Sequence, residues 1–288
     1  MEGVVPDAAS DGSSFDRLGL LMGAEAVDAF RRLRVIVFGV GGVGGWCAES
    51  LVRSGVGHVT VVDSDRVCAS NVNRQVMATS RTVGQMKVEA LRERLLEINP
   101  AAEIAAEARV YSAETSGTFG LDGFDYVVDA IDSVAAKAHL INAVTRLARP
   151  VLVSSMGAAR RTDPFRIRQS EFWKVRGDGL ARALRARFRK AGEFPARKTD
   201  PFRIRQSEFW KVQGDGLARA LRRRFRQLGE FPARKFTCVW SDELPASLGE
   251  GGALGSAVHV TAMFGFALAG LVLRAAGGTC QRAGDLVD

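Results

Sequence analysis

Short apolar runs alternate with amphipathic helical patterns through the first half of the chain. Three β-branched runs have the length of strands: RVIVFG (34–39), HVTVVD (58–63) and FDYVVD (124–129). Between them, WCAESLVRSG (46–55) and KVEALRERLLEINP (87–100) carry apolar residues at helical spacing. Strands that alternate with helices predict a parallel sheet with helices on both faces. We therefore expect a Rossmann-like, doubly wound α/β fold with a mostly parallel sheet and a C-terminal α+β extension.

A tandem repeat interrupts this pattern in the second half of the chain. Residues 162–198 recur at 199–235 with four differences, a period of 37. Two copies are too few to build a solenoid, so we interpret them as a segmental duplication inside another fold. Each copy contains a strand-like F-R-I-R-Q, then a helical pattern with Leu180, Leu184 and Phe188 on one face and arginines opposite.

The basic charge of the chain is concentrated in the repeat. The formal net charge is +8, yet the two copies alone hold 21 basic and 8 acidic residues, so the remaining chain is net acidic. A basic amphipathic helix is either a solvated face or a nucleic-acid contact, and the pattern is compatible with both. The 47% hydrophobic content excludes disordered and collagen-like chains. Four cysteines without a C-x-x-C pair indicate neither a structural zinc site nor a disulfide framework.

Glycines follow the first predicted strand directly. Gly39, Gly41 and Gly44 fit G-x-G-x-x-G between a strand and a helix, where backbone N–H groups can approach a phosphate. The second predicted strand ends in Asp63, at the spacing of an acid that binds ribose hydroxyls. A purely structural tight turn would also use such glycines. The flanking elements favour a nucleotide site.

The residues after Asp63 favour ATP over a nicotinamide cofactor. Arg74 and Lys87 can neutralise phosphates, and a hydride transferase has no evident use for them. Asp129 and Asp132 lie at the carboxyl end of the next predicted strand, the edge where open α/β sheets bind ligands. A carboxylate at this edge can hold Mg²⁺, and Asp132 is the candidate metal ligand. Taken singly, Arg74, Lys87 or Asp132 would more often form a surface salt bridge, and it is their ordered combination that favours the ATP site.

These motifs resemble the ThiF/MoeB superfamily of adenylating enzymes, which is related to ubiquitin-activating enzymes. The resemblance rests on G-V-G-G-V-G (39–44), D-S-D (63–65), S-N-V-N-R-Q (70–75), V-G-Q-M-K (83–87) and D-A-I-D-S (129–133). It implies ATP and Mg²⁺ as cofactors and a homodimer in which Arg17, from F-D-R-L-G-L-L-M-G, reaches the partner's ATP. It further implies catalytic roles for Arg17, Arg74, Lys87 and Asp132, the metal on Asp132, and ATP binding by Gly39, Gly41, Gly42, Gly44, Asp63, Asp65, Asn71, Arg74 and Lys87.

Within the superfamily the chain is most similar to the branch that dehydrates threonylcarbamoyladenosine in tRNA. FDRLGLLMG, DAIDSVAAKAHLI, DPFRIRQSEFWKV and CVWSDE carry that similarity. It implies ATP-dependent activation of a carboxylate, a cytoplasmic enzyme, tRNA as the substrate and a sulfur-relay protein as a candidate partner. The alternative within the family is adenylation of a ubiquitin-like sulfur carrier. Outside the family, the chain could be a nicotinamide oxidoreductase, or a nonenzymatic RNA-binding protein whose active surface the repeat blocks.

The expected organisation follows from these assignments. We expect a flexible tail at 1–14, an ATP-binding region at 15–155, a substrate and dimer region at 156–275 that contains both repeats, and a C-terminal tail at 276–288. The apolar run 258–273 is 16 residues long and contains two glycines, which favours a buried helix over stable transmembrane insertion. Cys238 is expected to be a small buried residue on a strand, and His259 a packed or capping histidine.

Overall fold

Seven strands form one sheet in the order β3-β2-β1-β4-β5-β7-β6. The computed structural model describes residues 14–175, 178, 180–181, 184, 234, 236–243 and 255–277. Every neighbouring pair is parallel except β6 and β7, which are antiparallel. The strands are β1 (Arg34–Phe38), β2 (His58–Val62), β3 (Glu103–Glu107), β4 (Tyr126–Asp129), β5 (Val151–Ser155), β6 (Ile167–Glu171) and β7 (Thr237–Ser241). The Rossmann-like, mostly parallel sheet predicted from the sequence is confirmed.

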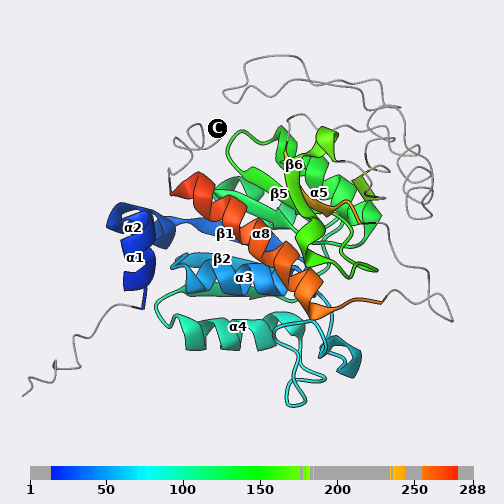
Figure 1. Ribbon diagram of the computed structural model, residues 1–288, viewed down its shortest axis with the longest axis horizontal. Coiled ribbons are helices and arrows are strands. Elements are labelled where there is room, and N and C mark those ends of the chain that lie inside the picture. Colours follow the sequence, from blue (N-terminus) through cyan, green and yellow to red (C-terminus); the bar gives the residue numbers. More distant parts are fainter. Residues whose placement is uncertain are drawn as a thin grey trace, which may run out of the picture.

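Helices cover both faces of this sheet (Figure 1). They are α1 (Asp16–Met22), α2 (Ala24–Arg32), α3 (Gly44–Arg53), α4 (Lys87–Ile98), α5 (Val134–Arg146) and α8 (Val258–Ala276). Alternate residues of β1 enter two different cores: Val35 and Val37 pack with α3, α4 and α8, whereas Ile36 and Phe38 pack with α5. This alternation, with apolar residues at both positions, is what a strand buried on both faces requires.

The C-terminal helix α8 is buried against α3. Gly265 allows this close approach, because a Cβ atom there would lie 2.6 Å from the carbonyl oxygen of Val43 and 2.8 Å from the Cβ of Trp46. Over its 19 residues α8 extends three beyond the apolar run that predicted it. Among the described helices it is the one long and apolar enough to cross a membrane by length and composition, and 44% of its apolar window is buried inside the protein.

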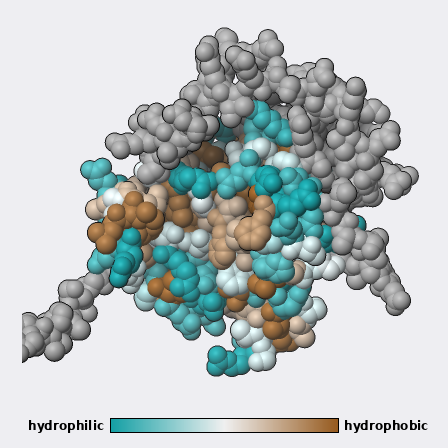
Figure 2. Space-filling model, in the orientation of Figure 1, coloured by the Kyte–Doolittle hydropathy of each residue, from teal (hydrophilic) through white to brown (hydrophobic). Residues whose placement is uncertain are grey.

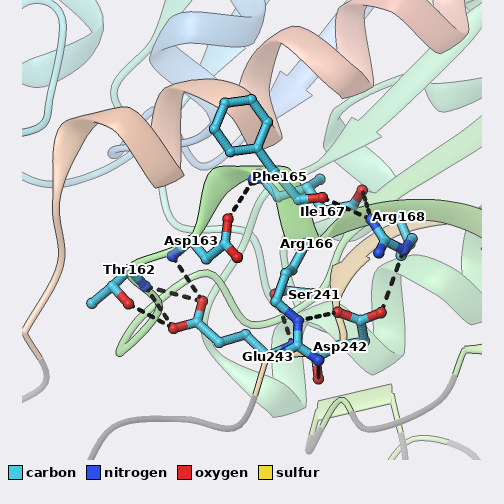
Figure 3. A network of polar contacts seen from close by, with 9 residues as sticks. All are labelled: Thr162, Asp163, Phe165, Arg166, Ile167, Arg168, Ser241, Asp242 and Glu243. Carbon is cyan, nitrogen blue, oxygen red and sulfur yellow. Dashed lines mark hydrogen bonds and ion pairs between the residues drawn. The ribbon is translucent and has the colours of Figure 1, made fainter.

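The first repeat copy supplies the edge strand β6. The strand begins at Ile167 and not at Phe165 as predicted, because Pro164–Arg166 form a 3₁₀ turn whose N-cap, Asp163, accepts a hydrogen bond from the Phe165 backbone N–H. Two carboxylates beyond β7 hold this segment (Figure 3). Glu243 accepts hydrogen bonds from the Thr162 and Asp163 backbone N–H groups, each at 3.0 Å. Asp242 forms ion pairs with Arg166 and Arg168, so these two arginines stabilise the sheet edge.

The second repeat copy contacts the sheet region through Arg234, near the end of that copy. Arg234 donates hydrogen bonds to the carbonyl oxygens of Val144, Thr145, Ala148 and Pro150, and thereby closes the C-terminal end of α5. The described residues therefore include the start of the repeat from copy one and, from the end of copy two, Arg234. Leu180 and Leu184, from the predicted basic helix, are buried in the second core, and Phe188 lies outside the described residues.

Candidate functional site

The glycine loop joins β1 to α3 at the carboxyl edge of the sheet. Gly39 has φ +81°, and a Cβ atom there would lie 2.8 Å from the carbonyl oxygen of Ala130, so only glycine fits. A Cβ atom on Gly44 would overlap the carbonyl oxygen of Gly39. Because β1 lies between β2 and β4, this loop opens at the point where the strand order reverses, the usual ligand crevice of such sheets.

Asp63 fastens the glycine loop to the end of β2. One carboxylate oxygen accepts the Val40 backbone N–H at 2.9 Å, and the other accepts the Asp65 backbone N–H at 2.9 Å. The side chain is half-buried, so it remains reachable from the crevice. In this geometry Asp63 orders the loop; ribose binding by the same carboxylate stays a prediction.

Arg74 lies beside the glycine loop. Its Cγ would be 3.4 Å from a Cβ atom on Gly42. The guanidinium donates to the carbonyl oxygen of Ser70 at 2.7 Å and to Asn73 Oδ1 at 3.0 Å, and the Arg74 carbonyl oxygen accepts from Trp46 Nε1 on α3. These contacts hold a half-buried cation at the mouth of the crevice.

Asn71 and Gln75 belong to the same S-N-V-N-R-Q segment. Asn71 is buried, and its Oδ1 accepts the Cys68 backbone N–H at 3.0 Å, which closes the 3₁₀ turn Ala69–Asn71. Gln75, which the sequence motifs did not place in the site, is 6% exposed and approaches Gly41 with Nε2. Its Oε1 has no hydrogen-bond partner among the described residues. A buried amide with a vacant acceptor beside the loop fits a site built for a polar ligand.

Lys87 begins α4 and points its ammonium group to the neighbouring loop. Its side chain is 8% exposed, and Nζ lies 2.7 Å from Asp65 Oδ2. The backbone repeats the link, because the Lys87 N–H donates to the Asp65 carbonyl oxygen at 3.0 Å. The D-S-D and V-G-Q-M-K motifs therefore meet through Asp65 and Lys87, which are 22 residues apart in the sequence.

Asp129 and Asp132 occupy the turn after β4. Asp129 is fully buried and forms an ion pair with Lys137 of α5 at 2.8 Å. Asp132 is exposed, and no described hydrogen bond or ion pair engages its carboxylate. Of the two acids, Asp132 is thus the one open to a ligand. No group of three or more His, Cys, Asp or Glu side chains gathers around a metal position within the described part of the chain.

Arg17 lies away from this cluster within its own chain. It is exposed on α1, and Phe15, two residues earlier, packs against Gly55 beyond the C-terminal end of α3. The glycine loop opens the other end of α3, as Figure 1 shows. One chain therefore brings together Arg74, Lys87 and Asp132 around the glycine loop but leaves Arg17 at the opposite edge of the sheet.

Two further residues have environments that bear on their expected roles. Cys238 is buried on β7, and burial raises the pKa of its thiol well above the ordinary value, which disfavours the nucleophilic thiolate. His259 Nε2 lies 3.0 Å from the carbonyl oxygen of Thr162. The pair of Lys137 and Asp129 was not predicted from the sequence, although a lysine within the apolar VAAKAHLI is an unusual feature.

Comparison with known proteins agrees with the geometry. The chain matches the ThiF family over residues 15–279. A tRNA threonylcarbamoyladenosine dehydratase of Bacillus subtilis is 43% identical over 178 residues, which cover 62% of this chain and 70% of that protein. The Escherichia coli enzyme of the same name is 38% identical over 59% of this chain and 63% of that protein.

Solved structures show the same likeness across almost the whole chain. The crystal structure of Escherichia coli tRNA N6-threonylcarbamoyladenosine dehydratase in complex with ATP has a TM-score of 0.73 and 32% identity, covering 94% of this chain and 96% of that one. The complex of that enzyme with AMP has the same TM-score at 31% identity, covering 92% of this chain and 94% of that one. The family match and the shared fold lead to one conclusion: the chain belongs to the ThiF family.

Proposed function

We propose that the protein catalyses the ATP-dependent cyclisation of threonylcarbamoyladenosine in tRNA, with net loss of water. One observation carries the proposal: the glycine loop, Arg74, Lys87 and the Asp132 turn gather at the carboxyl edge of the sheet, where the strand order reverses at β1. The relatives that share this fold over most of their length are named for that activity, and one of them was crystallised with ATP.

The chemistry requires the enzyme to position its substrates and to stabilise charge. In the proposed reaction the threonyl carboxylate attacks the α-phosphate of ATP and displaces pyrophosphate. The carbamoyl group of the same nucleoside then attacks the activated carbonyl carbon, the ring closes and AMP leaves. Arg74 and Lys87 would bind the phosphates through charge-assisted hydrogen bonds, and Asp63 would bind the ribose.

The residues at the edge also fit Mg²⁺. Mg²⁺ is commonly held by one or two carboxylates together with substrate phosphates and water, and Asp132 is an exposed carboxylate without another described partner. When bound, Mg²⁺ would neutralise charge on the phosphates. Lys87 must then exchange part of its contact with Asp65 for a phosphate oxygen.

A homodimer would explain the position of Arg17. On α1 the large apolar side chains of Leu20 and Leu21 are 85% and 81% exposed. Figure 2 shows apolar surface at the side of the molecule where α1 and α2 lie. Met263 and Phe266 of α8 are further exposed apolar side chains, at 41% and 42%. A second copy of the chain that covers this surface would bring Arg17 to the partner's ATP. The division into an ATP-binding region at 15–155 and a substrate and dimer region at 156–275 belongs to this proposal.

The surroundings of the enzyme are part of the proposal. A tRNA substrate fits a cytoplasmic enzyme whose basic repeat adds electrostatic affinity for RNA. Adenylation of a sulfur-carrier protein has less support, since a sulfur carrier protein adenylyltransferase of Thermus thermophilus matches only 47% of this chain. A sulfur-relay protein remains a proposed partner.

One experiment separates these functions. Purified protein is incubated with ATP, Mg²⁺ and unfractionated tRNA, and the nucleosides are analysed by mass spectrometry. We expect threonylcarbamoyladenosine to lose one water, and this loss to require ATP and to fail in Asp132→Asn. Unchanged nucleoside together with carrier-dependent exchange of pyrophosphate into ATP would instead establish the sulfur-carrier activity.

A further inference from the structure

A fully buried ion pair lies at the carboxyl end of β4, next to the proposed ATP site. Lys137 Nζ is 2.8 Å from Asp129 Oδ1, and both side chains are 0% exposed. Ser154 of β5 donates its hydroxyl to the other Asp129 carboxylate oxygen at 2.7 Å. The Lys137 ammonium also lies 3.4 Å from the Asp129 carbonyl oxygen and 3.4 Å from Ser154 Oγ. Three side chains from β4, α5 and β5 thus form one closed polar group.

Stability alone gives no reason for charges at this place. Removing a carboxylate and an ammonium from water costs about as much as their attraction returns, and apolar residues of similar volume often serve as well. A buried pair does impose one definite geometry, because displacing either partner leaves an unpaired charge in the interior. The question is which part of the molecule this geometry fixes.

The pair closes the turn that carries Asp132. Asp129 is the last residue of β4, and Lys137 lies in the first turn of α5, where its backbone N–H donates to the Ser133 carbonyl oxygen. Asp129 Oδ1 also accepts the Ile131 backbone N–H at 3.2 Å. The two ends of the intervening segment are therefore joined through one carboxylate.

Asp132 depends on this turn for its position. Its exposed carboxylate has no hydrogen bond or ion pair with the described residues, so the backbone of the turn sets the positions that this side chain can reach. A metal ligand must be held to within a fraction of an ångström to bind with full strength.

The same turn abuts the glycine loop. The Ala130 backbone N–H donates to the Phe38 carbonyl oxygen at 2.9 Å, and the Ala130 carbonyl oxygen occupies the space of a Cβ on Gly39. Backbone contacts with β1 and Gly39 therefore hold the Ala130 end of the turn, and the ion pair is left to hold the Asp132 end.

We propose that Lys137, Asp129 and Ser154 are positioning residues that hold the Asp132 carboxylate where it can bind a phosphate-bound divalent cation. This inference rests on the proposed function, because it assumes that Asp132 supports Mg²⁺ on ATP. The group touches neither ATP nor substrate. It acts through the turn between β4 and α5.

The test compares ATP binding with and without Mg²⁺ by calorimetry, which requires no turnover. The variant Asp129→Asn/Lys137→Met removes both charges at nearly constant volume and leaves no unpaired ion, so we expect it to fold. In the parent, ATP should bind more tightly with Mg²⁺ than in EDTA. In the variant, affinity in EDTA should stay within about threefold of the parent, and most of the gain from Mg²⁺ should be lost.

Two further variants complete the design. Ser154→Ala keeps both charges and removes only the hydroxyl that donates a hydrogen bond to the second Asp129 carboxylate oxygen. It should reduce the gain in ATP affinity from Mg²⁺ at least threefold. This variant provides the test if Asp129→Asn/Lys137→Met does not fold. Glu49→Gln is the control, because Glu49 is another buried carboxylate, paired with Arg94 and Arg53 in α4 and α3. It should lower the thermal midpoint and leave the gain from Mg²⁺ unchanged.

The outcomes distinguish this inference from the proposed function. A parent that binds ATP no better with Mg²⁺ shows that the metal part of the proposed function is wrong, and the positioning role fails with it. A parent that gains affinity from Mg²⁺, together with variants that keep the same gain within twofold, overturns the positioning role alone.

Discussion

Lys87 is the residue whose substitution should most directly test ATP binding in the crevice. Its ammonium is nearly buried, and among the described residues it forms an ion pair with one carboxylate, that of Asp65, which is itself 66% exposed. Lys87→Ala should weaken ATP binding by about 1.5–3 kcal/mol, the range for a hydrogen bond to a charged group. Calorimetric titration with ATP measures the effect. Arg31→Ala removes a surface ion pair with Asp28 on α2 and should leave the affinity unchanged; an equal loss there would show that the effect is not local.

Glu243 links the stability of the sheet edge to pH. Burial raises the pKa of Glu243, but hydrogen bonds from Asp163 and Thr162 outweigh it and leave the pKa below the ordinary value of 4.5. A carboxylate whose pKa is lower in the folded state than in the unfolded state stabilises the fold at pH values above its unfolded-state pKa. This stabilisation is lost as the pH falls through the folded-state pKa. The parent's urea midpoint should therefore fall more steeply than that of Glu243→Gln below about pH 4.5. Parallel curves for the two proteins would contradict the prediction.

At the scale of elements, the contact between α3 and α8 depends on one glycine. A Cβ at Gly265 would meet backbone atoms of Val43 and Cys47 that cannot rotate away. We expect Gly265→Ala to destabilise the fold by about 1–3 kcal/mol, as overpacking does, in chemical denaturation.

Gly270 in the same helix provides the matched control. A Cβ there would approach only the end of the flexible Arg274 side chain, at 3.3 Å. Gly270→Ala should therefore stabilise the helix by about 0.5–1 kcal/mol, since alanine loses less backbone entropy than glycine. If both substitutions had the same sign and size, the distance between α3 and α8 would not be set by Gly265.

For the whole molecule, the position of Arg17 predicts a site shared between two chains. Arg17→Ala and Asp132→Asn should each be inactive alone. Mixed under conditions where subunits exchange, they should recover up to about one quarter of the parental activity, because half of the dimers are hybrids and each hybrid has one intact site. Absence of recovery in demonstrated hybrids would contradict a site shared between the two chains.

The repeat predicts that one period of 37 residues is dispensable. Deleting 199–235 joins Lys198 to Phe236 and brings Arg197 to the position that Arg234 holds before β7. The unfolding free energy should be unchanged or slightly higher, because every described contact is retained and a shorter connection costs less entropy. The deletion also removes ten basic and four acidic residues, so the salt dependence of tRNA binding should flatten. A deletion variant that does not fold would mean that both copies are integral.

The sequence by itself determined the local elements and the kind of chemistry. The β-branched runs at 34–39, 58–63 and 124–129 contain β1, β2 and β4. They could be predicted because a strand that is buried on both faces has a short, nearly continuous run of apolar residues. The glycine spacing at 39–44 is equally local, because a tight turn excludes side chains wherever it occurs.

Only the tertiary structure decided which residues meet. Lys137 sits eight residues from Asp129, yet the ion pair forms because α5 folds back onto β4, and the hydroxyl of Ser154 arrives from another strand. Near-identical copies of the repeat could not show in sequence which one forms β6; the contacts of Glu243 and Asp242 with Thr162–Arg168 decided for copy one. The distance of Arg17 from the crevice was likewise invisible, because sequence patterns report burial and turns, whereas contacts between distant residues depend on how the elements pack.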